Sequence, residues 1–194
     1  MRYTTRDITY TGLFVALIVV GAFIKIDIPL PLYTMHFTLQ WLFVLIAGFL
    51  LGKKLGTMSV VAYIALGLLG VPVFAAGGGI GYVLRPGFGF LLGFVLAAYL
   101  IGALTEKLHA TRVHQLMIPA TIGLFAYYGV GAVYFYMIKN FYVHDSVSFA
   151  VVVVQYCLIT VIPDFILCVL AAVLSAQMMP VFKRMNIIGI REHA

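Results

Sequence analysis

Residues 88–104 read FGFLLGFVLAAYLIGAL, an apolar stretch without a single charged side chain. A helix needs about 20 residues of this kind to cross the hydrocarbon core of a bilayer. The rest of the chain has the same character, since 64% of its 194 residues are apolar and only 9% are charged. A soluble domain averages about 45–50% apolar and about 25% charged residues. The composition therefore excludes a soluble globular protein and predicts an integral membrane protein.

Further apolar runs flank this stretch on both sides. They cover residues 8–26, 38–51, 55–69, 117–138 and 148–179. The runs 38–51 and 55–69 are short for complete spans, so the former either extends back into residues 34–37 or lies partly in a protein-lined cavity. We expect an all-α integral membrane protein with six transmembrane helices, folded as a single membrane domain over residues 1–194.

Basic residues gather in the segments that this arrangement places on one side of the bilayer. With the N-terminus inside, the cytoplasmic side receives Arg2, Arg6, Lys53, Lys54, Lys107, Arg112, Lys183, Arg184 and Arg191, and the outside receives Lys25, Arg85 and Lys139. This nine-to-three split follows the positive-inside rule, so both termini are expected in the cytoplasm. The formal net charge of +6 is thereby assigned to orientation in a lipid bilayer and not to nucleic-acid binding.

The chain lacks the motifs of ATP hydrolysis, metal binding and intramembrane catalysis. The nearest approach to a P-loop, residues 48–54, has one spacer too few and Lys where Ser or Thr is needed. Cys157 and Cys168 lie in apolar runs without CxxC spacing, and the histidines, His36 among them, are interpreted as solvated loop residues. A span contains one carboxylate, Asp164, and no second one for acid–base chemistry. No catalytic residue, cofactor or metal is predicted.

Asp164 is the strongest candidate binding residue, because a charge within a membrane costs a few kcal/mol and usually serves a function. Pro163 beside it removes a backbone donor and is expected to kink the helix. Helical spacing places Cys157, Thr160, Asp164, Cys168 and Ala171 near one face. A carboxylate, a hydroxyl and small side chains on a kinked face suggest a cavity wall. The alternative is a structural ion pair of Asp164 with Arg85 or Lys139.

Residues 70–89, GVPVFAAGGGIGYVLRPGFG, contain seven of the 19 glycines. Such a segment suits a loop folded over a ligand, although glycines also simply end helices. Arg85 within it is either an interfacial residue or a clamp for a carboxylate substrate. The aromatic residues around it would line an apolar slot or anchor the chain at the interface: Phe74, Tyr82, Phe88 and Phe90. Gln40 adds a neutral hydrogen-bonding side chain at the outer end of the second run.

Two pairs of small residues, each four positions apart, would allow another helix to approach closely. Gly89 and Gly93 are expected to pack within the bundle. Gly12 and Ala16, near the cytoplasmic end of the first run, are expected to receive a partner protein, with internal packing as the alternative.

Several segments, taken in order, resemble one known family. They are FTLQ at residues 37–40, LLGKKLG at 50–56, GVPVF at 70–74, the glycine cluster, and PGFGFLLGF at 86–94. In this combination the chain is similar to the BioY family, the biotin-specific substrate-binding (S) components of energy-coupling-factor vitamin transporters. The similarity extends over essentially the whole chain and is densest from Gly21 to Phe94.

The resemblance implies a six-helix protein of the bacterial plasma membrane that binds biotin near the outer surface and is not an enzyme. It also implies a transmembrane coupling protein and two cytosolic ATPases as partners, with Gly12 and Ala16 at the contact with the coupling protein. The family's aspartate in the sixth span maps onto Asp164. The lysine that commonly follows three positions later is Leu167 here, so Lys139 or Arg85 would have to replace it.

For biotin, the expected contacts follow from the chemistry of its two ends. Asp164 would accept hydrogen bonds from the ureido N–H groups, and Arg85 would hold the carboxylate. The remaining expected site residues cover the thioether ring or complete the polar contacts: Phe74, Gly78, Gly79, Tyr82, Phe90 and Gln40. The other functions considered are a self-sufficient biotin carrier, a membrane enzyme acting on a lipid-embedded substrate, and a structural membrane subunit without a ligand.

Overall fold

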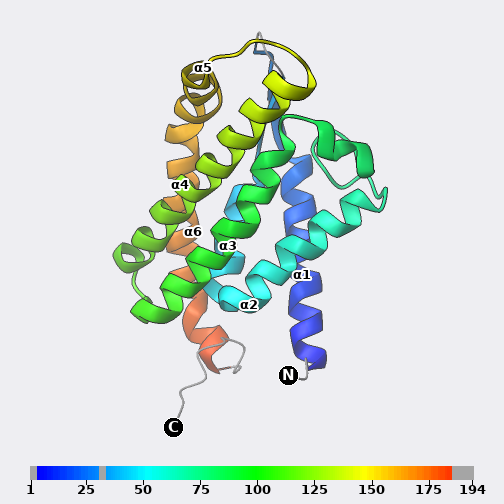
Figure 1. Cartoon of the computed structure of the whole chain (residues 1–194). Coiled ribbons are helices and arrows are strands. Elements are labelled where there is room, and N and C mark those ends of the chain that lie inside the picture. The colour runs from blue at the N-terminus through cyan, green and yellow to red at the C-terminus, as the bar shows by residue number, and fades with distance from the viewer. Residues whose placement is uncertain (1–3, 31–33, 185–194) are drawn as a thin grey trace.

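The computed structural model describes residues 4–30 and 34–184, except for the side chains of residues 183 and 184. The chain forms a helical bundle (Figure 1) of α1 (Thr5–Phe23), α2 (Gln40–Leu68), α3 (Phe88–Leu108), α4 (Val113–Met137), α5 (Phe149–Val153) and α6 (Ile159–Arg184). Shorter elements connect them: the strands β1 (Lys25–Ile28) and β2 (Met35–Thr38), the 3-10 turn η1 (Ile80–Leu84), and the π-helical turns η2 (Ile138–Tyr142) and η3 (Val154–Leu158).

Among the described residues, five helical segments are long and apolar enough to cross a membrane. They are Thr5–Phe23, Gln40–Leu68, Phe88–Leu108, Val113–Tyr142 and Phe149–Phe182. Large apolar side chains stay exposed on the outside of the bundle, among them Phe125 at 67% and Ile162 at 71%. An apolar exterior of this kind fits contact with lipid and not with water, so the chain is a multi-pass membrane protein.

The segment between residues 40 and 68 contains a sharp bend at one residue. Gly52 has φ +74° and ψ −176°, while the residues on both sides are helical. The positive φ favours glycine, and a Cβ at this position would collide with the carboxyl group of Glu106. Glu106 Oε1 accepts the N–H of Lys53 at 2.9 Å, and its other oxygen lies 3.3 Å from Lys53 Nζ. Glu106 therefore caps the second half of α2, which Figure 1 shows as an oblique cyan helix that leads away from the bend.

A two-stranded hairpin between α1 and α2 was not expected from the sequence. β1 and β2 pair antiparallel, with Lys25 opposite Thr38 and Asp27 opposite His36. The strands have four residues each, too few for a periodic apolar pattern to reveal them. The idea that the second apolar run extends back as a helix over residues 34–37 is wrong, because Met35–Thr38 is a strand.

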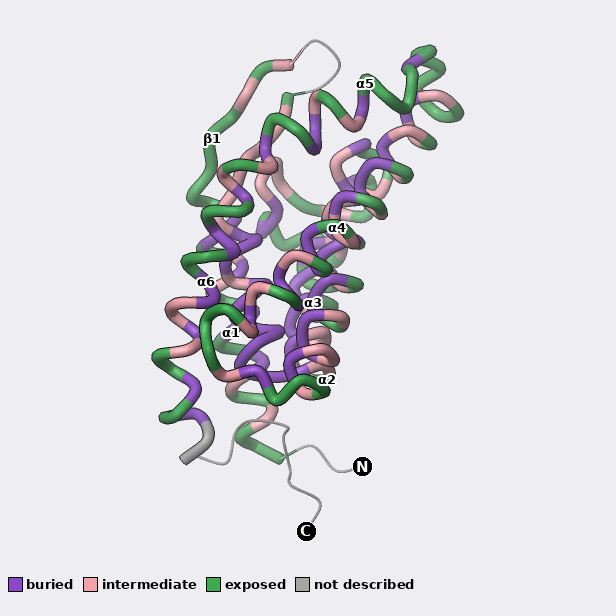
Figure 2. The backbone as a smooth tube through the Cα atoms, turned by 90° about the vertical axis from the view of Figure 1, so that its left-hand side faces the viewer, coloured by how far each residue is buried: buried purple, intermediate pink, exposed green. Residues whose placement is uncertain are grey.

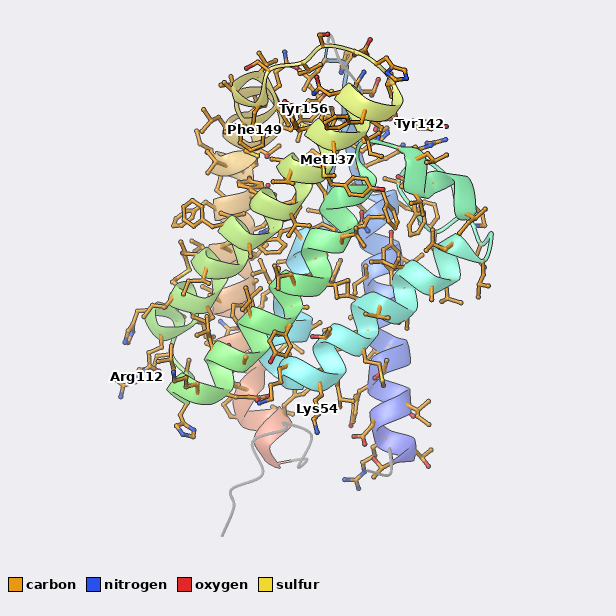
Figure 3. The ribbon with its side chains drawn as sticks, viewed as in Figure 1. Lys54, Arg112, Met137, Tyr142, Phe149 and Tyr156 are labelled. Carbon is orange, nitrogen blue, oxygen red and sulfur yellow. The ribbon has the colours of Figure 1, made fainter. Side chains whose placement is uncertain are left out.

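The two ends of the bundle carry different residues. Lys54 and Arg112 lie at the lower end in Figure 3, and Tyr142, Phe149 and Tyr156 lie toward the upper end. α1 begins and α6 ends at the same end as Lys54. Arg2 and Arg191, which entered the charge count, lie outside the described residues, and the side chains of Lys183 and Arg184 are not described either.

The bundle packs closely where small residues face neighbouring helices, and the buried backbone lies on the inward sides of the helices (Figure 2). A Cβ at Gly89 would collide with the side chain of Tyr134, and one at Gly93 would lie 2.6 Å from the carbonyl oxygen of Tyr127. Both contacts join α3 to α4, so the prediction that this pair packs within the bundle is confirmed.

Candidate functional site

A cavity opens between the hairpin and the upper parts of the helices. Its empty space, counted with the open mouth, is about 740 Å³. Its lining consists of Met35, His36, Phe37, Thr38, Gln40, Trp41, Ala75, Tyr82, Gly87, Phe90, Leu91, Phe94, Tyr127, Phe135, Tyr156, Thr160 and Asp164. Tyr156 places it toward the end of the bundle opposite Lys54 (Figure 3). The apolar run 38–51 therefore lies partly in a cavity, which Thr38, Gln40 and Trp41 line, as one of the two sequence interpretations predicted.

Asp164 is the acidic residue of this lining, and its side chain is held by neutral groups. The residue is 2% exposed, and its Oδ2 accepts a hydrogen bond from Tyr128 Oη at 2.6 Å. Thr160, one helical turn earlier, lies 3.0 Å from the same tyrosine oxygen. None of the ion pairs among the described residues includes Asp164. The interpretation of Asp164 as one half of a structural ion pair is therefore wrong.

The two cations proposed for that ion pair have other partners. Lys139 is 7% exposed and bonds Asp145 at 2.7 Å, within the segment that joins α4 to α5. Arg85 is exposed, donates to the carbonyl of Ala76 at 3.0 Å and lies 5.0 Å from the ring centre of Tyr82. Neither lines the cavity.

Pro163 is the fifth residue of α6, and α6 directly follows the π-helical turn η3. The irregularity expected around Pro163 therefore falls before it, at Val154–Leu158. The face predicted from helical spacing is buried as a whole: Cys157, Thr160, Asp164, Cys168 and Ala171 are each 6% exposed or less. This face turns Thr160 and Asp164 toward the cavity.

Aromatic rings form one wall of the cavity. Trp41 is 1% exposed and stacks on Tyr127 with the ring centres 5.0 Å apart. Phe94 stacks on the same tyrosine at 4.9 Å, and Phe90 meets its edge at 5.5 Å. The rings come from α2, α3 and α4, so helix packing fixes their positions. Flat apolar surfaces of this kind bind a small ring system while a few polar groups orient it.

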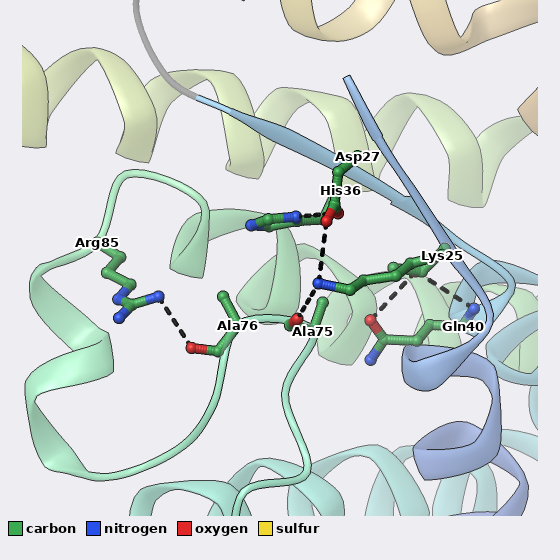
Figure 4. A network of polar contacts seen from close by, with 8 residues as sticks. Lys25, Asp27, His36, Gln40, Ala75, Ala76 and Arg85 are labelled. Carbon is green, nitrogen blue, oxygen red and sulfur yellow. Dashed lines mark hydrogen bonds and ion pairs between the residues drawn. The ribbon is translucent and has the colours of Figure 1, made fainter. Parts of the chain in front are cut away.

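A polar network joins the hairpin to the glycine-rich loop beside the cavity (Figure 4). His36 Nδ1 lies 2.6 Å from Asp27, and Lys25 Nζ lies 3.3 Å from the same carboxylate. Lys25 also donates to the carbonyl of Ala75 at 2.8 Å. The hydrogen bond from His36, with the contribution of Lys25, lowers the pKa of Asp27 below its usual value. Since His36 and Ala75 both line the cavity, this network joins the hairpin to the glycine-rich loop at the opening.

The structure brings together about half of the residues expected at the site. Gln40, Tyr82, Phe90 and Asp164 line the cavity. Gln40 is 3% exposed, donates to Tyr63 Oη at 2.7 Å and accepts from Thr38 at 3.1 Å. Phe74 lies behind the wall, where it packs against Tyr82 with ring centres 4.5 Å apart. Gly78 and Gly79 belong to the loop beside the opening and, like Arg85, do not line the cavity.

Sequence reasoning missed several residues of the site. The interpretation of His36 as a solvated loop residue is wrong, because His36 lies in β2 and lines the cavity. Lys25 enters the sequence interpretation only through orientation, although Lys25 and Asp27 lie at the end of the first apolar run, and this position was a usable signal. The adjacent tyrosines Tyr127 and Tyr128 within a span were a second usable signal, since a phenol in a membrane helix usually finds a polar partner.

Gly12 and Ala16 lie on an exposed face of α1. A Cβ at Gly12 would meet no other atom within 4 Å, and Ala16 is likewise exposed. Ile8 and Val20, at the same helical spacing, are 63% and 50% exposed. In the described part of the chain these residues therefore face outward, and internal packing does not account for the pair at Gly12 and Ala16.

Fold and cavity together define a multi-pass helical membrane protein with a site for a small, partly polar molecule. The chain matches the model of the BioY family over residues 1–184, and it belongs to that family.

Two relatives and one solved structure illustrate the similarity. The chain is 38% identical to the probable biotin transporter BioY of Lysinibacillus sphaericus, over 94% of this chain and 91% of that one. It is 42% identical to the biotin transporter BioY of Thermotoga maritima, over 72% of this chain and 78% of that one. A crystal structure of the S-component for biotin from an ECF-type ABC transporter superimposes with a TM-score of 0.80 and 26% identity, covering 92% of this chain and 95% of the other.

Proposed function

We propose that this chain is the biotin-binding membrane subunit of an energy-coupling-factor vitamin transporter, and not an enzyme. Its family membership, the names of its relatives and the fold of the biotin S-component support this function. The observation that carries the proposal is the cavity, in which aromatic rings surround a single buried carboxylate. Biotin offers the complementary groups, since it joins an apolar thioether ring to a cyclic urea with two N–H donors.

The polar ends of biotin fit opposite ends of the cavity. A carboxylate accepts N–H donors strongly, so the ureido ring goes to Asp164. The thioether ring then lies against Trp41, Phe90 and Tyr127, where water is excluded. The valerate tail points to the mouth, since the cations near the cavity are there.

Lys25 and Arg85 are the candidates for receiving the carboxylate of biotin. Lys25 Nζ bonds the carbonyl of Ala75, which lines the cavity, and Arg85 bonds the carbonyl of the next residue, Ala76 (Figure 4). Both side chains thus hold the same short stretch of the glycine-rich loop. A carboxylate arriving at the mouth would meet positive charge from two sides. Leu167, where the family commonly has lysine, is buried and apolar. A cation at the mouth is therefore needed to pair with the carboxylate of biotin.

The bend at Gly52 supports six membrane spans in place of five. The halves of α2 run in different directions, and Lys53 and Lys54 follow the bend directly. If the two halves count as two spans, the chain crosses the membrane six times and ends on the side where it began. Lys54 and Arg112 then mark the cytoplasmic end, the cavity opens outward, and both termini are cytoplasmic in a bacterial plasma membrane.

The partners that would supply energy are a transmembrane coupling protein and two cytosolic ATPases. The exposed small residues Gly12 and Ala16 support a close helix–helix contact on α1. The chain itself contains no P-loop, so ATP hydrolysis has to come from outside it.

Purification of the chain alone, followed by denaturation and mass spectrometry of the released small molecules, tests the proposed ligand. We expect biotin in amounts that approach one molecule per chain when the expression medium contains it. A preparation that is folded by circular dichroism but releases no biotin, and takes none up when biotin is added, would contradict the proposal.

A further inference from the structure

The carboxylate of Asp164 is buried without a positive charge beside it. It is 2% exposed, and none of the ion pairs within residues 4–30 and 34–182 includes it. Position 167, one turn further along α6, is a buried leucine. A buried carboxylate that lacks a cation needs hydrogen bonds to offset its lost hydration.

Tyr128 supplies the shortest one. Its Oη donates to Asp164 Oδ2 at 2.6 Å, from α4 to α6 across 36 positions of the chain. Tyr128 is 7% exposed and does not line the cavity, whereas Asp164 and Thr160 do. The phenol therefore lies behind the carboxylate, on the side away from a ligand.

Thr160 is the other hydroxyl beside this phenol. A phenol has one proton, and here it goes to Asp164. Thr160 Oγ1 lies 3.0 Å from the same phenol oxygen and also donates to the carbonyl of Tyr156 at 3.1 Å. In this arrangement Tyr128 donates to Asp164 Oδ2 from the side away from the cavity. The other acceptor positions of the carboxylate face the cavity.

We propose that Tyr128 is a positioning residue that holds Asp164 as a pure hydrogen-bond acceptor and thereby selects ligands carrying N–H donors. The proposal rests on the proposed function, in which the ureido ring of biotin meets Asp164. The neutral phenol of Tyr128 orients the carboxylate of Asp164, as a neighbouring cation would otherwise do. Its effect on biotin therefore acts through Asp164 and disappears when Asp164 is no longer a carboxylate.

A double-mutant cycle tests this dependence. Biotin affinity is measured by titration calorimetry on the full chain in lipid nanodiscs for the unmodified protein, Tyr128→Phe, Asp164→Asn and the double variant. A charge-assisted hydrogen bond supports an expected loss of roughly 10- to 100-fold for Tyr128→Phe in the unmodified background. In the Asp164→Asn background the same change should cost less than about 3-fold, because the group that it positions is gone.

Tyr134→Phe is the matched control. Tyr134 lies on the same helix, donates its hydroxyl to the carbonyl of Val83, and does not line the cavity. Its variant should bind biotin within about 2-fold of the unmodified protein, as expected for a hydroxyl outside the acceptor site.

The outcomes separate the positioning role from general packing and from the proposed function. Tyr128→Phe with unchanged affinity would overturn the inference, and so would an equal loss in the Asp164→Asn background, which indicates packing. An unmodified chain that bound no biotin would overturn the proposed function as well.

Infrared difference spectroscopy of biotin binding adds a readout that needs no binding constant. The carboxylate band that disappears in Asp164→Asn should be displaced in Tyr128→Phe and unchanged in Tyr134→Phe, and an undisplaced band in a folded Tyr128→Phe protein would contradict the inference.

Discussion

Asp164 receives its hydrogen bond from a neutral tyrosine at 2.6 Å, and the cations near the cavity, Lys25 and Arg85, bond backbone carbonyls at the mouth. The acceptor and the positive charges are thus at different parts of the site. A ligand with N–H donors at one end and a carboxylate at the other meets both without a charged pair inside the bundle. Buried ion pairs carry a large desolvation cost, so this separation favours reversible binding of a small acid.

The carboxylate end can be examined with single substitutions at the mouth. Arg85 is exposed, so Arg85→Ala should weaken biotin only up to roughly 5-fold, the effect of a solvent-screened charge pair. Lys25→Ala should cost about 10-fold, since its bond to the carbonyl of the cavity-lining Ala75 holds the positive charge of Lys25 beside the cavity.

Biotin methyl ester is the control ligand for both variants, because it lacks the negative charge. Its affinity should change less than about 2-fold in Arg85→Ala and Lys25→Ala if their effect is electrostatic. Equal losses for acid and ester would show that the two side chains only hold the loop in place.

At the scale of elements, the helices of the bundle follow the apolar runs, because length and hydropathy decide which segments enter a bilayer. The hairpin could not be predicted in this way, since Met35–Thr38 becomes a strand only by pairing with Lys25–Ile28. Asp164 could be predicted from its cost in a membrane. Tyr128 could be suspected of a polar partner as a phenol within a span, but its pairing with Asp164 could not be predicted, because the contact depends on how α4 packs on α6.

The outward face of α1 should matter for transport and not for binding. Replacing Gly12 or Ala16 by Leu adds bulk where the described chain has open space, so folding and biotin affinity should stay within about 2-fold. Biotin uptake by cells should fall at least about 10-fold, because the coupling protein can no longer approach closely.

Gly93→Leu is the contrasting variant, since its Cβ would press on the backbone of Tyr127 inside the bundle. It should reduce the folded yield and biotin binding together. If Gly12→Leu behaved like Gly93→Leu, the α1 face would be an internal packing surface. Uptake unaffected by Gly12→Leu and Ala16→Leu would favour a carrier that works without the coupling protein.

At the scale of the whole molecule, the ends of the bundle differ in charge and in the presence of the cavity. Lys54 and Arg112 mark one end, and the cavity with Tyr156 lies toward the other. Single cysteines introduced at positions 54 and 85 of a variant without Cys157 and Cys168 should therefore react from opposite sides. A membrane-impermeant maleimide added to intact cells should label position 85 and spare position 54, and the reverse pattern would contradict the orientation.

The central claim is that the cavity binds biotin by its urea through Asp164. Lipoate is the discriminating comparison, because it has a similar acid tail and a sulfur-containing ring but no N–H donor. Calorimetric titration of the purified full chain should give one saturable biotin site and binding of lipoate at least roughly 100-fold weaker, the effect of losing two hydrogen bonds to a buried carboxylate. Equal affinity for both acids, or no binding of biotin, would contradict the account.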